Sequence, residues 1–277
     1  MTSAKRSRKD APPMIDQHTH TNESPDASEK ATPESYAGTT MEAVTLTDHV
    51  DFDSPVELFQ TTPDFDTLFQ KKALLNEVKG TPRIGVGVEL GWQPQIENAM
   101  KALVERHPFD LAIMSLHTGD GLDFHNGDFF RRYGRERGIE RYFELVLESL
   151  ETYRDFDVYG HIDYISRYVP GAPRDYDYET HKSIIDTILK RLIELDKAIE
   201  VNTSAVWKYG LEHFNPKLEV LKRYYALGGR KIMLGSDAHD PENVAEDFDK
   251  ALKLLKDVGF NRICHYKERE CVWTSLQ

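Results

Sequence analysis

The sequence predicts a single α/β domain whose parallel sheet closes into a barrel related to the (β/α)8 form. Three observations predict this. Seven short apolar runs recur along the 277 residues. Segments with apolar residues at spacings of three and four, typical of amphipathic helices, lie between them. No Gly- or Pro-rich linker divides the chain. An open, doubly wound sheet is the structural alternative.

The predicted strands are short, and several are rich in β-branched residues, which favours buried strands. They lie at residues 14–16, 43–46, 84–88, 111–114, 158–160, 198–201 and 231–234. The predicted helices are clearest at residues 138–153, 179–195 and 245–257. Alternating strands and helices indicate a parallel sheet.

The composition limits the partners and the cellular compartment that are expected for this domain. The net charge of −12 argues against duplex nucleic acid as the main partner, because phosphate repels a negative surface. Two cysteines cannot form a disulfide framework, so a reducing cytoplasm is expected. No apolar run reaches the roughly 18 residues of a membrane span. Residues 1–13 read as a disordered basic tail, and the barrel domain is expected at 14–277.

Polar residues follow each predicted strand at its carboxyl end. In chain order they are His18 and His20, His49, Glu89, His117, His161 with Asp163, Asn202 to Ser204, and Asp237 with His239. In a parallel barrel these ends share the face on which active sites form. A lone buried histidine usually serves packing, but packing would favour Val or Leu at so many strand ends. We therefore expect one cleft to collect these residues.

The chemistry of this set points to divalent metals. A His-x-His pair such as His18 and His20 directs both imidazoles to one side of a strand. Asp237 and His239 repeat that spacing, and Glu89 can bridge two ions. Six imidazoles with several carboxylates exceed the needs of one tetrahedral zinc site, which implies two or three ions. Mixed nitrogen and oxygen ligands suit zinc, manganese or iron.

At this point the sequence resembles the PHP family (polymerase and histidinol phosphatase). The matching motifs are HTH at 18–20, TDH at 47–49, GVEL at 87–90, SLH at 115–117, GHID at 160–163 and GSDAH at 235–239. The resemblance implies a distorted, TIM-like (β/α)7 barrel. It also implies three divalent metal ions at the carboxyl ends of the strands.

The resemblance also implies which residues hold each ion. One ion would be held by His18, His20, Glu89 and Asp237. A second would share Glu89 and add His117 and His161. A third would use His49 and His239. Some family members have a further histidine where this chain has Asp26, which can also bind metal.

Within the family, four segments are most similar to histidinol-phosphate phosphatases. They are HTHTNESPD at 18–26, HTGDGLDF at 117–124, GHIDYISRY at 160–168 and EVNTS at 200–204. This similarity implies hydrolysis of L-histidinol phosphate, a step of histidine biosynthesis, and a phosphate contact from Arg167. The branch usually has an arginine soon after the Asn-Thr-Ser. Here Lys208 would replace it as a point charge, without the bidentate fork.

The expected reaction is attack of a metal-bridging hydroxide on phosphorus. The metals and Arg167 would neutralise charge on the phosphoryl oxygens. Glu89, Asp237 and His239 complete the predicted catalytic set. Either of the last two, or a water on the third metal, is a candidate proton donor to the leaving oxygen.

Other polar residues receive supporting roles. Asp120 and Asp123, in the polar loop 118–128, are candidate acceptors for the substrate's amine and imidazole. His125 in the same loop can reach the site. Asp16 and Asp48 stand beside predicted ligands and are candidates to orient imidazoles.

Two other functions remain open. A PHP-type phosphoesterase acting on nucleotides, oligonucleotides or another small ester would share the metal cluster. Nucleic acid remains an alternative partner because the chain has a basic run formed by Arg131, Arg132, Arg135 and Arg137. A small-molecule ester is the expected substrate. A non-catalytic metal-binding module is the third reading, but such a protein would be expected to have lost ligands. No membrane partner is expected, and the oligomeric state is not predicted.

Overall fold

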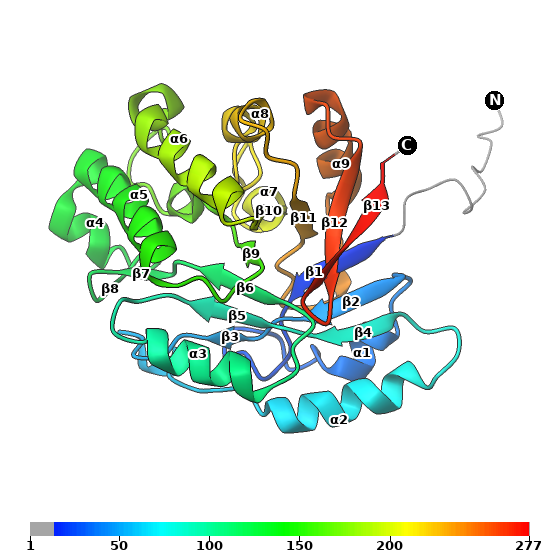
Figure 1. Cartoon of the computed structure of the whole chain (residues 1–277). Helices are drawn as coiled ribbons and strands as arrows, with labels where there is room; N and C mark the ends of the chain where they lie inside the picture. Colours follow the sequence, from blue (N-terminus) through cyan, green and yellow to red (C-terminus); the bar gives the residue numbers. More distant parts are fainter. Residues whose placement is uncertain (1–13, 277) are drawn as a thin grey trace.

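A computed structural model describes residues 14–276, so the predicted tail at 1–13 lies outside the described residues. In the described part, all seven predicted strands are present, in two parallel sheets (Figure 1). The first sheet has the order β1 (Ile15–Thr19), β2 (Ala43–Leu46), β4 (Arg83–Val86). The second has the order β11 (Ile232–Gly235), β10 (Ala198–Asn202), β9 (Val158–Tyr159), β6 (Ala112–Ser115), β5 (Val88–Gly91), β3 (His49–Val50).

The two sheets are connected along the chain and by hydrogen bonds. β2 continues into β3, and β4 continues into β5 after a break at Gly87. Gly87 N donates to Leu46 O at 2.7 Å, just at this break. On the other side, Asp237 N donates to His18 O and His20 N donates to Ala238 O, each at 2.8 Å. Backbone hydrogen bonds therefore join β1 to the segment that follows β11.

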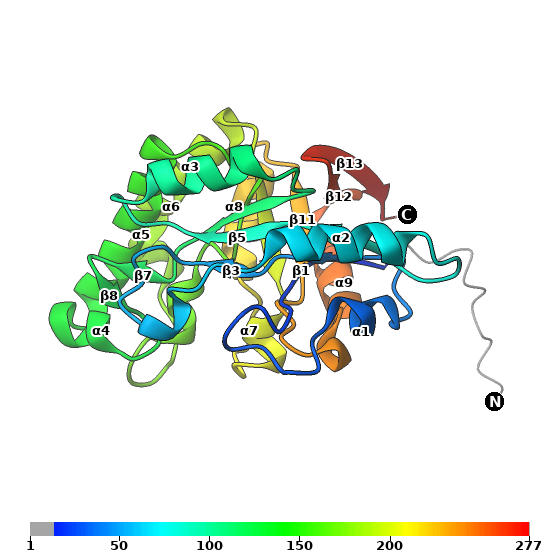
Figure 2. The same cartoon turned by 90° about the horizontal axis from the view of Figure 1, so that it is seen from below.

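Helices cover both sides of the strands. Figure 1 shows α2 and α3 below the sheet and α5, α6 and α8 above it, and Figure 2 shows α1 and α7 on the same side as the loops after β1. The helices are α1 (Pro33–Ala37), α2 (Phe65–Asn76), α3 (Glu97–Arg106), α4 (Asp128–Tyr133), α5 (Arg135–Thr152), α6 (Tyr178–Glu194), α7 (Ser204–Trp207), α8 (Leu218–Ala226) and α9 (Phe248–Val258). Three short 3-10 turns are η1 (Glu57–Phe59), η2 (Tyr164–Arg167) and η3 (Pro241–Asn243).

Helix α5 shows why the helical predictions hold. Its apolar residues recur at spacings of three and four, and Ile139, Tyr142, Val146 and Leu150 are all buried. The charged residues between them face solvent, so one stripe packs on the sheet. The helix begins after Gly134, whose φ of 72° is a left-handed conformation that glycine adopts without strain.

Two antiparallel hairpins were not predicted. β12 (Arg262–Lys267) and β13 (Glu270–Ser275) form a C-terminal hairpin. It packs on the sheet, where Gln17 Nε2 donates to Tyr266 O at 2.8 Å. The second hairpin, β7 (Thr118–Gly119) and β8 (Leu122–Asp123), lies inside the predicted polar loop 118–128.

The parallel arrangement brings the strand ends together. Because the strands of both sheets run in one direction, their polar carboxyl ends lie on one side of the molecule. The apolar core between strands and helices is fully buried, as at Val44, Ile84 and Met114. In the part of the chain that the structure describes, every helix is too short or too polar to cross a membrane.

Candidate metal centre

The nine residues predicted as metal ligands all lie in one cluster at the carboxyl ends of the strands. Glu89 lies at its centre. This residue belongs to β5, and its carboxylate is fully buried. Its Oε1 lies 3.1 Å from His117 Nε2 and 2.9 Å from His161 Nε2. Its Oε2 lies 3.1 Å from His18 Nε2 and 2.9 Å from His49 Nδ1. One carboxylate thus faces four imidazoles, as expected of a group that bridges two cations.

Asp237 is the second carboxylate of the cluster. Its Oδ1 lies 3.3 Å from His20 Nε2 and 3.9 Å from His18 Nε2. Its Oδ2 accepts hydrogen bonds from Ser204 Oγ at 3.0 Å and Arg167 Nη1 at 3.1 Å. The partners of Oδ2 fix the carboxylate so that Oδ1 faces the imidazoles. Asp237 has a φ of 56°, a strained conformation typical of functional sites.

A third group forms around Asp26. Its Oδ2 lies 3.0 Å from His239 Nε2, and its Oδ1 lies 3.8 Å from His49 Nε2. The ring of His20 stacks on both of these imidazoles, with centroids 4.2 Å from His239 and 4.1 Å from His49. An aspartate at this position therefore stands where a ligand is needed.

The donor atoms of the cluster fit divalent cations. Ligand atoms of three triplets lie within 4.8 Å of one another: His20, His49 and His239; His18, His20 and Glu89; His49, Glu89 and His117. Several of these atoms are buried and form no hydrogen bond of regular geometry, although carboxylate oxygens lie close to them, among them the Nε2 atoms of His18, His20 and His239. Buried polar atoms are rarely left unpaired. Neutral imidazoles and carboxylates are the ligands that zinc and similar ions prefer.

The pKa shifts follow from burial and neighbouring charge. Burial raises the pKa of Glu89, but the imidazoles of His18, His117 and His49 outweigh it and hold this pKa well below its usual range. Burial also raises the pKa of Asp237, and the neighbouring imidazoles and Arg167 again lower it well below the usual value. Burial, with His49 and His239 beside it, lowers the pKa of His20. These shifts favour the ionised carboxylates and the neutral form of His20, which are forms that bind metal. For His18, His49 and His117, burial lowers the pKa, but the facing carboxylates outweigh it and raise the pKa.

Sequence reasoning missed the residue that orients His18. Glu200 Oε1 lies 2.7 Å from His18 Nδ1, and both side chains are fully buried. The bond leaves Nε2 of His18 facing Glu89. A carboxylate within the buried run AIEVN of β10 was the available signal, because an unpaired buried charge is costly.

The two residues predicted to orient imidazoles behave differently from each other. Asp48 accepts from Ser24 Oγ at 2.8 Å, and Ser24 Oγ lies 3.3 Å from His20 Nδ1, so Asp48 reaches a ring through a hydroxyl. Asp16 instead accepts hydrogen bonds from Ser236 and from Ala245 N at 2.8 Å. It thereby ties β1 to the segment after β11, and its hydrogen-bond partners include no imidazole.

A cavity of about 530 Å³ opens beside the cluster. Its wall includes His49 and His117 from the cluster and an aromatic side formed by Tyr164, Tyr168 and Tyr209. Its volume is in the range of small-molecule sites, roughly 300–1,000 Å³. The remaining described residues along its wall are Asp26, Asp51, Ser54, Val56, Leu58, Phe59, Thr118, Asp123, His125, Asn126 and Lys208.

The cavity receives only some of the residues predicted to bind substrate. Lys208, Asp123 and His125 line it. Lys208 is the one lysine or arginine among its described lining residues, and its Nζ lies 3.3 Å from His239 Nδ1. Asp120 is held elsewhere, because its carboxylate forms an ion pair with Arg141 at 2.8 Å and accepts from Tyr133 OH.

Arg167 is buried, with 1% of its surface exposed. Its guanidinium donates to Asp237 Oδ2, to Asn202 Oδ1 at 3.0 Å and to Asn215 Oδ1 at 2.9 Å. It also lies 4.7 Å from the ring centroids of Tyr164 and of Tyr209. The partners of its guanidinium here are thus protein groups, and the phosphate contact expected of Arg167 stays a prediction.

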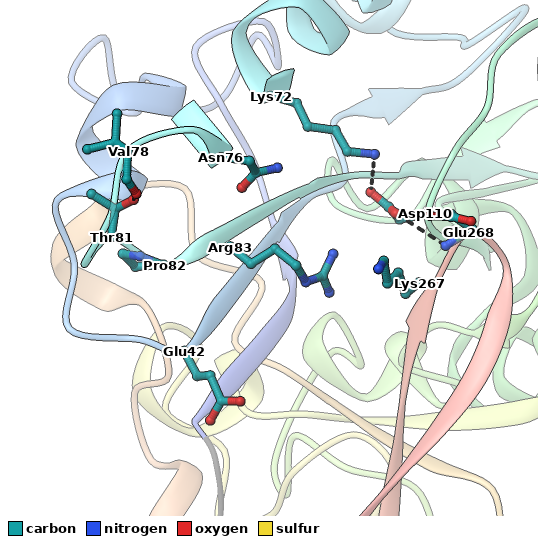
Figure 3. Close-up of a pocket in the computed structure, with 10 residues that line it drawn as sticks. All are labelled: Glu42, Lys72, Asn76, Val78, Thr81, Pro82, Arg83, Asp110, Lys267 and Glu268. Atoms are coloured by element: carbon teal, nitrogen blue, oxygen red, sulfur yellow. Dashed lines mark hydrogen bonds and ion pairs between the residues drawn. The ribbon is translucent and has the colours of Figure 1, made fainter. Parts of the chain in front are cut away.

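A second cavity, of about 470 Å³, lies at the opposite ends of the strands (Figure 3). Lys72 pairs with Asp110 at 2.8 Å, while Arg83 and Lys267 point toward one another across the space. Three carboxylates and three cations line it, with no imidazole among them. The mixture of charges there does not resemble a metal site.

The parallel sheets and the cluster at their carboxyl ends define an α/β protein built around a candidate metal centre. The family model of the PHP domain matches residues 16–204. The chain belongs to the PHP domain family. The match includes most of the cluster, while Asp237 and His239 lie beyond it.

Three comparisons place the chain within that family. It is 27% identical over 258 residues to the histidinol-phosphatase of Lactococcus lactis, covering 91% of this chain and 94% of the relative. A Clostridium acetobutylicum relative that also carries a histidinol-phosphatase name is 29% identical over 221 residues, covering 79% and 84%. The crystal structure of the Lactococcus lactis histidinol phosphate phosphatase with zinc, L-histidinol and phosphate superposes with a TM-score of 0.85 at 25% identity, over 94% of this chain and 99% of that one.

Proposed function

We propose that this chain is a divalent-metal-dependent phosphomonoesterase that hydrolyses L-histidinol phosphate to L-histidinol and phosphate. The observation that carries the proposal is the cavity of about 530 Å³ that opens directly on the imidazole and carboxylate cluster. The zinc, L-histidinol and phosphate in the Lactococcus lactis structure support the same substrate for this chain. The biosynthesis of histidine in the cytoplasm is the expected setting, and both cysteines are free thiols, as that compartment favours.

We propose three divalent ions, held as the family resemblance implies. His18, His20, Glu89 and Asp237 would hold the first ion. The carboxylate of Glu89 is shared, because its two oxygens face different imidazoles. The second ion would add His117 and His161, and the third would use His49, His239 and Asp26.

We also propose that the strands form one distorted seven-stranded barrel. The support is the pair of connections between the two sheets, one at Gly87 and one between β1 and Ala238. In this arrangement β2 with β3, and β4 with β5, each count as one strand with a break. The breaks distort the barrel beside the metal cluster.

When bound, the divalent ions supply Lewis acidity and a nucleophile derived from water near neutral pH. The chain's own residues then have distinct tasks. Glu89 and Asp237 are held ionised by the surrounding imidazoles, as their lowered pKa values indicate. Lys208 presents an ammonium to the cavity for the phosphoryl oxygens. Arg167 holds Asp237, and a contact with phosphate would require rearrangement of the two tyrosines around it.

The leaving oxygen of this substrate is an alkoxide and needs a proton. Because the pKa of Asp237 is held low, His239 is the better donor of the two predicted candidates. Its Nδ1 lies 2.9 Å from Asp237 O and faces Lys208, at the edge of the cavity. For the substrate's amine and imidazole, Asp123 lines the cavity and is the acceptor we favour over Asp120.

Nucleic acid is not favoured as a substrate. The predicted basic run is neutralised by its own neighbours: Arg131 pairs with Asp128, and Arg137 pairs with Glu140 at 2.9 Å. Arg135 donates to backbone carbonyls of the 170–175 segment. Few free cations are therefore left in the run to bind a phosphate backbone.

A substrate panel tests the proposal. Phosphate release is measured with zinc-loaded protein on L-histidinol phosphate, nucleoside monophosphates and a single-stranded oligonucleotide. We expect kcat/KM to be highest for L-histidinol phosphate, by roughly a hundredfold or more, since a site built for polar substrate groups discriminates strongly. Equal or faster release from a nucleotide would replace this substrate with the alternative ester.

A further inference from the structure

Asp51 is a buried carboxylate that sequence reasoning left without a role. It follows β3 directly and lies two residues after His49, so its side chain returns to the face of the sheet that carries the cluster. Its Oδ1 lies 2.8 Å from His117 Nδ1. The residue is 5% exposed, so this contact is shielded from bulk water.

The contact decides which nitrogen of His117 faces the cluster. A carboxylate only accepts hydrogen bonds, so Nδ1 of His117 carries the proton that Asp51 binds. With a metal ion bound in the cluster the ring would be neutral, and its lone pair would then be on Nε2, which lies 3.1 Å from Glu89 Oε1. The imidazole is therefore fixed in both tautomer and direction.

Gly91, at the end of β5, makes room for this carboxylate. A Cβ atom at this position would lie 1.8 Å from Asp51 Oδ1, 2.6 Å from Asp51 Cγ and 3.3 Å from His117 Nδ1. The φ of Gly91 is outside the left-handed region, so the backbone conformation does not require glycine. Space for Asp51 is the reason that remains.

The second oxygen of Asp51 also faces a residue of the metal cluster. Oδ2 is buried without a hydrogen-bond partner and lies 3.8 Å from His49 Nδ1, whose nearer neighbour is Glu89 Oε2 at 2.9 Å. The carboxylate thus lies between two predicted ligands, His49 and His117. A surface carboxylate with a merely structural role would have neither neighbour.

We propose that Asp51, seated against Gly91, is a positioning residue that fixes the imidazole of His117 for divalent metal. The inference rests on the proposed function, because it deepens the account of the same metal centre. It predicts that substitutions at Gly91 and at Asp51 lower the metal affinity through the same contact, so that their effects do not add. Groups that orient metal-binding imidazoles are typically worth about ten- to a hundredfold in metal affinity.

The test measures zinc affinity by chelator competition, with metal content by mass spectrometry, for full-length variants whose thermal unfolding is followed in parallel. We expect Asp51→Ala to lower the affinity of at least one zinc ion about ten- to a hundredfold. Asp51→Asn keeps an acceptor for Nδ1 and should lose markedly less. Gly91→Ala should resemble Asp51→Ala, because the added methyl displaces the carboxylate.

A double-mutant cycle separates this role from general strain. In an Asp51→Ala background the colliding oxygen is gone, so Gly91→Ala should cost little further zinc affinity. Gly85→Ala is the control: its Cβ would lie 2.8 Å from Thr45 Oγ1, a milder clash than the one at Gly91 and outside the cluster. We expect that variant to bind zinc as the parent does.

Two outcomes would overturn the inference. One is an Asp51→Ala protein that binds zinc with unchanged affinity and stoichiometry. The other is a Gly91→Ala cost that is as large without Asp51 as with it. If the parent protein binds zinc but fails to hydrolyse L-histidinol phosphate, the proposed function falls while the zinc measurements still decide on Asp51.

Discussion

The residues expected to bind metal can be predicted from the sequence more easily than the residues that orient them. The expected ligands stand at strand ends, some in pairs such as His18 with His20 and Asp237 with His239, so their positions together with the family resemblance predict them. Glu200 and Asp51 contact ligands that lie 182 and 66 positions away along the chain. Such partners depend on which strands lie side by side, and spacing carries no information about that.

The bond between Glu200 and His18 gives a prediction at this scale. Glu200→Gln keeps the size of the side chain but replaces the charged acceptor of the His18 Nδ1 proton with a weaker one. We expect the affinity for zinc to fall, but by less than the ten- to a hundredfold that accompanies complete removal of such a partner. Competition with a chromogenic chelator measures it. Glu219→Gln, an exposed position on α8, is the control, and an equal loss in both variants would remove the role of Glu200.

At the scale of elements, the buried strands were predictable and the short polar elements were not. Apolar runs bounded by polar clusters predict β1, β6, β10 and β11 because buried parallel strands have no solvent-facing side. The β12–β13 hairpin is buried only in part, with exposed residues at both ends of each strand. The antiparallel pairing of its two strands lies outside the alternation of parallel strands and helices on which the prediction rests.

Helix α7 makes a prediction about Lys208. This residue caps α7, and the helix places its ammonium in the cavity beside His239. We expect Lys208→Ala to raise KM for L-histidinol phosphate about tenfold, because one charge-assisted hydrogen bond to phosphate is lost. Lys208→Arg should restore most of the affinity. Steady-state kinetics at saturating zinc distinguish them, and an unchanged KM in the alanine variant would place phosphate elsewhere.

The segment before α6 gives a prediction that depends on pH. Asp175 binds His213 Nε2 at 3.2 Å and Lys217 Nζ at 2.8 Å, which ties this segment to the start of α8. Burial raises the pKa of Asp175, but these two hydrogen bonds outweigh it and lower the pKa to about 2 from the usual 3.8. An acid with a lowered pKa in the folded state contributes stability above its unfolded pKa and loses it at lower pH.

We therefore expect Asp175→Asn to lower the free energy of unfolding by about 1 kcal/mol at pH 7, a figure reduced for partial exposure. The difference from the parent should shrink as the pH falls from about 4 toward 2. Urea unfolding at pH 7, 4 and 3 measures it. A cost that stays constant across this range would show that the carboxylate charge is not its source.

At the scale of the whole molecule, the net charge says little about the site. The chain has a charge of −12, yet Arg131 and Arg137 of its basic run pair with carboxylates of α4 and α5, and the cluster gathers carboxylates that face imidazoles. Bound cations would set the local field there and attract phosphate to an acidic protein. The sequence predicted the parallel α/β architecture and the place of the site. It could not predict the cavity wall, because loops from distant segments form it.

Phosphate release from L-histidinol phosphate by protein freed of metal and then titrated with zinc tests the central claim most directly. We predict no release above background from the metal-free protein, and a rate that rises with added zinc and saturates at a fixed number of ions per chain. Full activity in protein with no detectable metal would contradict the account. So would zinc-saturated protein that leaves L-histidinol phosphate intact.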